Sequence, residues 1–546
     1  MKTTSLDAET LAMILAAVQD FAQKRLPGAL LRELDHKDEC PEQILREMYG
    51  PQFGLHLLFI DEQYGGLGGG AYDIYRVSEA IAQVDLGLAS AVLATFLGLD
   101  PILVGGTAEQ KSKWMTQVAE KGWIVAYGVT EPTAGSDLAA LRTKADPVER
   151  DGQLVGYTLN GSKQFITNGG IADLYTILAR TENGFTFFIV EKGADGLNIG
   201  KAEDKHGIRI SNTAPLTFED MFVPIENLVG QEGRGMVYAQ QVFGYTRLMV
   251  ATFGLGGGMA AFKAAVQYAQ ERVQAGSPLI DKQAYTHKLL VPHAVRLEAA
   301  RAYIEETSRR IDAGEQNLNA EGAIAKLVAT EAGNAAADAA IQALGGYGYT
   351  KEYPIEKIRR DVRITTIYEG TSEIIEWTIA RARWQEHLKT RGQYYTHQIS
   401  QLERLHRQSA DVNANLVALT LHALSAILER ARLGRLTRNQ HILFRIGEWV
   451  ACAESAAALA RYAADPTPKV SGLDQSTVKA ISRIYARQTA LHVATEGLRY
   501  ILGAQNGIDA GELEQTLNLP DIYGAQSGLL ADMDVVAAAL KNTNLA

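Results

Sequence analysis

One carboxylate stands out in residues 364–373, which read Ile-Thr-Thr-Ile-Tyr-Glu-Gly-Thr-Ser-Glu. Glu369 lies between an aromatic residue and Gly370, and a glycine lets the backbone come close to a ligand. Thr371 and Ser372 follow as hydroxyls that can cap a helix or hold an anion. A carboxylate in this setting can act as a base that reaches into a narrow pocket. An ordinary loop exit would also accept these residues.

Two further segments place hydroxyl groups beside backbone amides. Residues 127–137 read Tyr-Gly-Val-Thr-Glu-Pro-Thr-Ala-Gly-Ser-Asp, and residues 160–169 read Asn-Gly-Ser-Lys-Gln-Phe-Ile-Thr-Asn-Gly. Exposed amides and hydroxyls of this kind suit an electron-rich ring edge or a pyrophosphate. Each segment taken alone also fits ordinary turn chemistry.

A glycine cluster at residues 254–258, Gly-Leu-Gly-Gly-Gly, invites a dinucleotide-binding interpretation. The dinucleotide fingerprint needs a strand, a turn and a helix together, with a third glycine at a fixed spacing. Here the cluster lies within a helical pattern, no strand is predicted before it, and no third glycine falls at the required spacing. We therefore interpret the cluster as a place where helices pack closely.

The hydrophobic pattern predicts the elements that must position these residues. Residues 1–122 have helical spacing, and residues 123–235 form short alternating runs separated by Asp-Gly and Asn-Gly turns. The runs predict an antiparallel, barrel-like sheet. A helical bundle follows at 236–385, then a polar linker with some helix at 386–415 and an extra helical domain at 416–546. Because strands and helices are segregated, the fold class is α+β.

Length and composition narrow the functional classes. The 546 residues correspond to three or four domains at ~150 residues each. With 47% hydrophobic and 21% charged residues, the chain has the composition of a globular protein with a large core. Its formal charge of −10 argues against a general nucleic-acid binder, which needs a basic surface. Small molecules stay open as partners.

The cysteines and apolar segments bear on the compartment. Cys40 and Cys452 cannot build a disulfide framework and lack metal-ligand spacing, so we expect a reducing compartment and no bound metal. The amphipathic N-terminus lacks the pattern of a signal peptide. The longest mainly apolar run, residues 414–428, is shorter than the ~20 residues that cross a bilayer. We expect a cytoplasmic protein that lies at most on the inner face of the membrane.

Taken together, the motifs resemble the acyl-CoA dehydrogenase family, flavoproteins that form the 2,3-double bond of acyl-CoA thioesters. The resemblance spans about residues 1–385 and implies a helical domain, a central β domain and a four-helix bundle. The motifs that carry it, in family order, are Tyr64-Gly65-Gly66-Leu67-Gly68, Val129-Thr130-Glu131-Pro132 with Gly135-Ser136-Asp137, Phe165-Ile166-Thr167-Asn168-Gly169, Leu344-Gly345-Gly346-Tyr347-Gly348, Tyr353-Pro354 with Arg360-Asp361, and Tyr368-Glu369-Gly370-Thr371-Ser372.

The resemblance implies a mechanism. Glu369 matches the base that removes the α-proton of the thioester, while a hydride leaves the β-carbon for the flavin N5 of FAD. A carboxylate enclosed by substrate and flavin has its charged form disfavoured, which raises its pKa toward the working pH. A backbone N–H at the base and a ribityl hydroxyl hold the thioester carbonyl, which stabilises the charge that develops there.

The resemblance also implies binding residues. Thr167 matches the hydroxyl that faces N5, and Phe165 stands where the family often has tryptophan. Arg272 and Gln283 belong to a set that meets FAD across a subunit interface, and Ala275 replaces the usual aromatic residue near them. The full cofactor set is Tyr127, Val129, Thr130, Ser136, Phe165, Ile166, Thr167, Arg272, Gln283, Gln342, Gly345, Gly346, Thr371 and Glu373. The substrate set is Ser136, Arg247, Tyr368 and Gly370.

The extra helices resemble the extension of very-long-chain acyl-CoA dehydrogenases, which replaces a second dimer and contacts the membrane. A basic run in this extension could meet anionic lipid or could be salt-bridged to the subunit. Its members are Arg430, Arg432, Arg435, Arg438 and Arg445. The implied partners are an acyl-CoA, an electron-transfer flavoprotein and further copies of the chain, as a homodimer or a homotetramer.

Three related functions stay open. An acyl-CoA oxidase would share the base and the flavin and would use O2. A DNA-binding relative would carry a basic extension, but residues 391–546 hold 15 basic and 14 acidic residues. An assembly factor would have lost turnover, although Glu369 is intact. The segment 91–99, which matches the acyl pocket, carries no charge, so an aliphatic or aromatic acyl group is favoured over a dicarboxylate. Leu93 and Phe96 could shorten the acyl tunnel or line a long one.

Overall fold

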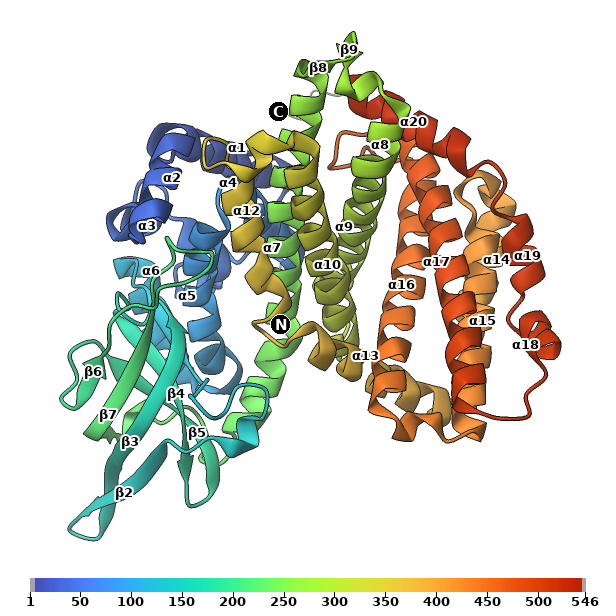
Figure 1. The fold of residues 1–546 in the computed structure, drawn as a ribbon. Helices are drawn as coiled ribbons and strands as arrows, with labels where there is room; N and C mark the ends of the chain where they lie inside the picture. The colour runs from blue at the N-terminus through green and yellow to red at the C-terminus, as the bar shows by residue number, and fades with distance from the viewer. Residues whose placement is uncertain (1–4, 543–546) are drawn as a thin grey trace. The chain divides into compact units, whose positions relative to one another are not determined.

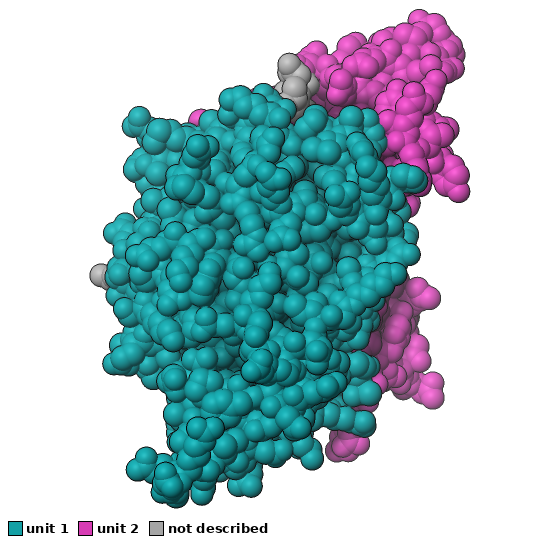
Figure 2. All heavy atoms as spheres, turned by 90° about the vertical axis from the view of Figure 1, so that its left-hand side faces the viewer, with its two compact units in different colours: residues 1–249, 308–316, 360–364 teal, residues 250–307, 317–359, 365–546 magenta. Residues whose placement is uncertain are grey.

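The computed structural model describes residues 5–542, apart from the side chains of residues 243–245. The chain divides into two compact units (Figure 2). Unit 1 comprises Met1–Met249, Ser308–Gln316 and Arg360–Ile364, and unit 2 comprises Val250–Thr307, Asn317–Arg359 and Thr365–Ala546.

Unit 1 begins with helices, as the spacing predicts (Figure 1). They are α1 (Ala8–Arg25), α2 (Gly28–Lys37), α3 (Glu42–Tyr49), α4 (Ala71–Val84), α5 (Leu86–Gly105) and α6 (Ala108–Lys121). Several of these helices begin at a residue whose side chain accepts a hydrogen bond from a backbone N–H group of the first turn. Asp7 accepts from Thr10 N, Asp85 accepts from Leu88 N, and Thr107 forms a reciprocal capping box with Gln110.

Two helices among the described residues, α5 and α7 (Gly235–Glu271), are long and apolar enough to cross a membrane. In each, most of the apolar window is buried inside the protein, at 83% for α5 and 78% for α7. Burial of that extent is typical of core helices in a globular fold. Length and composition alone therefore do not indicate a membrane span here.

The strand region of unit 1 forms a seven-stranded sheet in the order β1-β4-β2-β3-β7-β6, with β5 beside β4. The strands are β1 (Val125–Gly128), β2 (Lys144–Arg150), β3 (Gln153–Thr167), β4 (Leu174–Thr181), β5 (Gly184–Glu191), β6 (Leu197–Ile199) and β7 (Thr213–Pro224). The predicted Asp151-Gly152 turn joins β2 to β3, with both residues at positive φ, which suits a tight hairpin. The prediction of antiparallel pairing is confirmed for β2–β3, β3–β7, β4–β5 and β6–β7, but β4 pairs with β1 and β2 in parallel.

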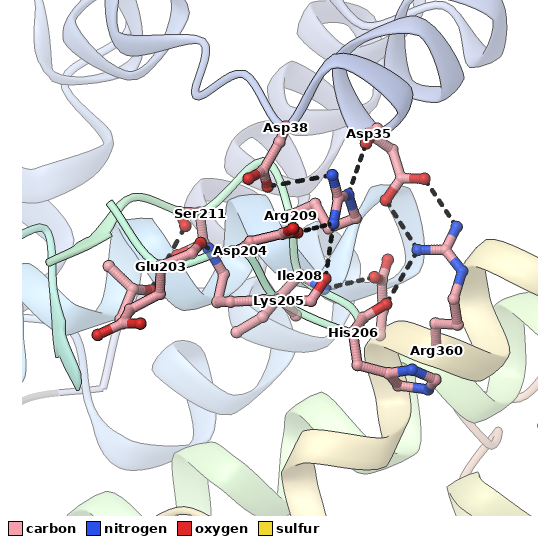
Figure 3. A network of polar contacts seen from close by, with 12 residues as sticks. Asp35, Asp38, Glu203, Asp204, Lys205, His206, Ile208, Arg209, Ser211 and Arg360 are labelled. Carbon is pink, nitrogen blue, oxygen red and sulfur yellow. Dashed lines mark hydrogen bonds and ion pairs between the residues drawn. The ribbon is translucent and has the colours of Figure 1, made fainter. Parts of the chain in front are cut away.

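A loop of unit 1, residues 203–211, is held by polar contacts to two helices (Figure 3). Arg360 donates to the His206 carbonyl of the loop at 3.2 Å and makes two hydrogen bonds, of 2.7 and 3.1 Å, to the Asp35 carboxylate of α2. The neighbouring Asp361 accepts from the backbone N–H of Ile208 at 2.6 Å. These contacts explain the Arg-Asp motif as a clamp within the fold, because bidentate arginine–carboxylate pairs fix geometry as well as charge.

Unit 2 contains the C-terminal part of α7 and the helices that follow it. They are α8 (Gln283–Leu289), α9 (Val291–Asp312, up to Thr307), α10 (Asn319–Leu344), α11 (Gly346–Tyr349), the start of α12 (Ile355–Val362) and α13 (Ser372–Lys389). The glycine cluster lies inside α7, as predicted. A Cβ at Gly254 would stand 2.6 Å from Thr330 Cα, and one at Gly258 would stand 2.6 Å from Gly333 Cα. Glycine therefore lets α7 and α10 pack closely, and the packing interpretation is confirmed.

The extension continues unit 2 with helices. They are α14 (Thr396–Gln408), α15 (Ala414–Leu433), α16 (Gln440–Ala464), α17 (Gln475–Ala504), α18 (Ala510–Thr516), α19 (Leu519–Gly524) and α20 (Leu529–Asn542). A buried cluster joins α13 to α16 and α10, because Arg383 bonds both Glu454 oxygens at 2.7 and 2.8 Å and Glu321 at 3.0 Å. The segregation of helices from strands confirms the α+β class.

Three arginines of the basic run, Arg430, Arg432 and Arg445, form ion pairs within the extension. Arg432 pairs with Glu429 at 2.6 Å, Arg445 pairs with Glu448 at 2.5 Å, and Arg430 lies 3.4 Å from Glu512. Two of these pairs have the i,i+3 spacing of neighbours on one helix face. These three pairs are consistent with the salt-bridged alternative for this part of the run.

Candidate active site

The predicted base lies in a short loop between a 3-10 turn and α13. Glu369 has a φ of 54° and Gly370 a φ of 98°, so two successive residues have left-handed backbone. For a residue with a Cβ, this conformation costs of order 1–2 kcal/mol and persists only where neighbours hold it. The loop then ends at Thr371, whose side chain accepts from Ile374 N and starts α13. The glycine and the capping hydroxyl therefore have defined structural roles beside the carboxylate.

A buried lysine holds this loop from α10. Lys326 Nζ donates to the Gly370 carbonyl oxygen at 2.6 Å, and its side chain is fully buried. One turn further along α10, Glu331 accepts from the Ser372 hydroxyl at 2.6 Å. Sequence reasoning missed Lys326, although a lone lysine in the Ala-rich stretch 320–344 is a signal that could have drawn attention to it.

We expect Lys326→Met to lower kcat with the acyl-CoA substrate that the resemblance implies, while the protein still folds and keeps the flavin that the resemblance implies. Methionine keeps the length of the side chain but removes the donor, so the left-handed loop loses a charge-assisted hydrogen bond worth about 1.5–3 kcal/mol. Steady-state assays with an acyl-CoA should give kcat lower by roughly ten- to a hundredfold. Lys351→Met, an exposed lysine of the same unit, is the control. An unchanged kcat in Lys326→Met would show that the loop holds its shape without this bond.

The predicted flavin residues of unit 1 come from two adjacent chain segments. Tyr127 is on β1, Val129 and Thr130 follow that strand directly, and Phe165–Thr167 end β3. The backbone N–H of Gln164 donates to the Thr130 carbonyl at 2.9 Å, which places the segments side by side. The structure therefore brings together two predicted segments that lie about 35 positions apart in the sequence.

The side chains of this group differ in what they can contact. Val129 and Ile166 are buried, so they can offer a ligand only their backbone, while Tyr127 and Thr167 are half-buried. Phe165 is 63% exposed and has a φ of 60°. A bulky residue at positive φ is unusual and is a feature of functional sites. The ring of Phe165 is thus presented to solvent, where a planar ligand could cover it.

A buried ion pair lies directly behind these two segments. Lys163 Nζ lies 2.8 Å from Glu131 Oε1 and donates to the Val129 carbonyl at 3.1 Å. Glu131 also accepts from the backbone amides of Arg142 and Thr143, at 2.6 and 3.0 Å. Burial lowers the pKa of Lys163 to about 8, although the carboxylate opposes this shift. Burial would raise the pKa of Glu131, but Lys163 and the amides outweigh burial and lower it. Sequence reasoning missed this pairing.

Four of the predicted cofactor residues line one cavity in unit 2. The cavity has a volume of about 530 Å³, and Arg272, Gln342, Gly345 and Gly346 are among its lining residues. At both glycines, no heavy atom of the described residues that could obstruct a Cβ lies within 4 Å. Tyr347 also lines the cavity, and its ring is 43% exposed. A guanidinium, open backbone and an aromatic face fit the pyrophosphate and the ring of a nucleotide.

The other predicted residues of unit 2 are not among the residues that line this cavity. Gln283 begins α8, where its amide donates to Asp534 of α20 at 3.0 Å. Glu373 is exposed in the first turn of α13, and Tyr368 is half-buried beside the base. In unit 1, Ser136 is exposed and Arg247 is half-buried on α7.

Comparison of the sequence with known proteins identifies one family. Family models for the N-terminal, middle and C-terminal domains of acyl-CoA dehydrogenases match residues 8–122, 126–221 and 233–383. A short-chain-specific acyl-CoA dehydrogenase of Megasphaera elsdenii is 38% identical over 369 residues, which cover 66% of this chain and 94% of that protein. The chain belongs to the acyl-CoA dehydrogenase family.

Two solved structures are also similar to this acyl-CoA dehydrogenase. A structure described as the electron transferring flavoprotein of Acidaminococcus fermentans contains a chain that is 35% identical, with a TM-score of 0.64 over 69% of this chain and 98% of that chain. An acyl-CoA dehydrogenase of Bacillus anthracis complexed with FAD covers 98% of this chain and 96% of its own, with a TM-score of 0.82 at 24% identity. The second match shows that the extension is part of a known fold.

FAD is the cofactor of this oxidoreductase, as its membership of the acyl-CoA dehydrogenase family indicates. The residues present fit it, because unit 2 offers the open, arginine-lined cavity and unit 1 offers the exposed Phe165 ring with adjacent backbone. When bound, FAD supplies the hydride acceptor. The protein groups bind and orient it and move the proton.

Proposed function

We infer that this acyl-CoA dehydrogenase forms 2,3-enoyl-CoA thioesters with Glu369 as the base and passes the electrons to an electron-transfer flavoprotein. The observation that carries the inference is the loop around Glu369, which is held in a left-handed turn by Lys326 and by the cap at Thr371. A base that must meet a carbon-bound proton needs a fixed position, because small displacements cost large factors in rate. In the family a backbone N–H at the base helps to hold the thioester carbonyl, and we propose the same role for the backbone of this loop.

An uncharged acyl group is the proposed substrate class. The segment 91–99 lies in α5 and is apolar, with Leu93 3% and Phe96 4% exposed. The Phe96 ring stacks on Phe59 with centroids 3.5 Å apart, which holds it in one rotamer within an aromatic cluster. A carboxylate at the end of an acyl chain would lose its hydration beside this helix without gaining an evident partner. The Megasphaera elsdenii relative is a short-chain-specific acyl-CoA dehydrogenase, which is consistent with an aliphatic chain.

The electron acceptor and the oligomeric state are proposed from the similar structures and from the extension. The similarity to a chain in the Acidaminococcus fermentans electron-transferring flavoprotein structure supports a flavoprotein acceptor. The extension favours a homodimer, in the cytoplasm, whose subunits share the FAD pyrophosphate at Arg272 and Gln342 in the manner implied by the family. Peripheral contact with the inner face of the membrane stays a proposal, because Arg432 and Arg445 of the basic run pair with neighbouring glutamates.

The test is an acyl-CoA panel with ferrocenium as acceptor. We expect turnover of straight and branched aliphatic acyl-CoA thioesters, at least about tenfold slower turnover of a glutaryl thioester, and no hydrogen peroxide in air. The ΔΔG behind this preference is the cost of burying an unpaired carboxylate. Preferential oxidation of the dicarboxylate would contradict the substrate class. Stoichiometric peroxide would contradict the acceptor and make the protein an oxidase.

A further inference from the structure

The last helix of the extension, α20, contacts the segment of unit 2 that carries the nucleotide cavity (Figure 1). Asp534 Oδ1 accepts from the Gln283 amide at 3.0 Å and lies 3.3 Å from His287 Nε2, both on α8. Lys541 Nζ lies 2.6 Å from Asp281 Oδ1, just before α8. The contacts place two charged side chains of the extension on one short stretch of the chain.

A third contact reaches the other side of that stretch. The Gln270 amide, near the end of α7, donates to the backbone carbonyls of Leu540 and Lys541 at 3.0 and 3.2 Å. Arg272 follows two positions later and lines the cavity. The helix α20 therefore contacts the chain both before and after Arg272.

The segment between these contacts has little support of its own. It is a hairpin of two two-residue strands, β8 (Val273–Gln274) and β9 (Ser277–Pro278), whose turn includes Ala275 at a φ of 46°. An isolated hairpin is marginal in water even when its strands are longer. Its closure includes a 2.9 Å bond from Leu279 N to Arg272 O, and both residues line the cavity. The position of the guanidinium thus depends on what holds the ends of the hairpin.

The helix α20 is itself fixed within the extension. Asp532 accepts from Arg483 and, at 2.5 Å, from Arg487, both on α17. Arg487 is buried and also donates to the carbonyls of Ala525 and Ser527 just before α20. A helix anchored by buried charge pairs can act as a rigid support for a weaker element.

We propose that α20 is a clasp for the nucleotide half of the FAD site, with Asp534 and Lys541 as positioning residues that hold the hairpin of Arg272 in its binding conformation. Gln283 then acts through Asp534 and α8 and not from the cavity wall. The inference rests on the proposed FAD-dependent function and assigns to the extension a role in retaining the cofactor.

The test is the Kd for FAD binding to the apoenzyme, which is measured by the quenching of flavin fluorescence. For Asp534→Ala/Lys541→Ala we expect the Kd for FAD to rise at least about fivefold, the scale of a typical coupling between sites. The single variant Lys541→Arg keeps the positive charge that pairs with Asp281 and leaves Asp534 unchanged, so it should bind FAD with wild-type affinity. Asp521→Ala, an exposed acid on α19, is the matched control and should bind FAD like the wild type.

A mutant cycle separates the clasp from a general loss of stability. In an Arg272→Ala background, the double substitution should raise the Kd by less than twofold, because coupled residues are non-additive. An additive effect, or equal affinities of the double variant and the wild type, would overturn the clasp. Wild-type apoenzyme that takes up no FAD would instead overturn the proposed function, so the two failures are distinguishable.

Discussion

The Glu369→Gln variant is expected to purify with FAD bound and to lose turnover by roughly a hundred- to ten-thousandfold, the contribution typical of a positioned general base. Glutamine has nearly the same shape but cannot accept the α-proton. The loop around it is held through the backbone, by Lys326 at the Gly370 carbonyl and by the Thr371 cap, so the substitution should not displace it. The measurements are the visible absorbance of the purified protein and kcat with an aliphatic acyl-CoA.

Two comparisons make this result specific to the base. Glu386→Gln, at the other end of α13, should retain full activity. The Glu369 variant should also fail to exchange the α-proton of a thioester with solvent deuterium, which the wild type should do. Full dehydrogenation by Glu369→Gln would remove the carboxylate from the mechanism.

Lys163→Met is expected to destabilise unit 1 by about 3–5 kcal/mol, because it leaves the buried Glu131 carboxylate without its cationic partner. The Val129 carbonyl also loses its Lys163 donor, so the backbone of the predicted flavin-binding segment is held less firmly. The measurements are urea denaturation and the FAD content of the purified protein, and both should fall below the wild-type values.

Control variants separate the ion pair from the loss of a surface charge. Lys144→Met, an exposed lysine on β2, should leave both quantities unchanged. Lys163→Met/Glu131→Gln should recover part of the lost stability, since removing both charges of a buried pair costs less than removing one. Wild-type stability in Lys163→Met alone would show that the pair does not support the site.

The sequence was informative where function is encoded in adjacent residues. The string around Glu369 predicted a carboxylate beside a permissive glycine, and the structure gives that glycine a φ of 98°. The glycine cluster in α7 was correctly separated from a nucleotide loop, because a helix can need glycine for close packing against Thr330 and Gly333. The segregation of strands from helices followed directly from the change of hydrophobic period.

The sequence could not show which side chains contact one another when they lie far apart along the chain. Lys163 and Glu131 meet across 32 positions, and Gln283 and Asp534 meet across 251. Neither member of such a pair has a local pattern that identifies its partner. The alternating strand pattern likewise predicts which side chains face the core and does not determine strand direction, so the parallel β1–β4 pairing was not predicted.

Anaerobic mixing of the purified yellow protein with a saturated aliphatic acyl-CoA tests the central claim most directly. The flavin absorbance should bleach in the wild type, and mass spectrometry should find the thioester two hydrogens lighter, whereas Glu369→Gln should stay yellow. A wild-type protein that binds FAD yet neither bleaches nor changes the thioester, across the acyl-CoA panel, would contradict the account.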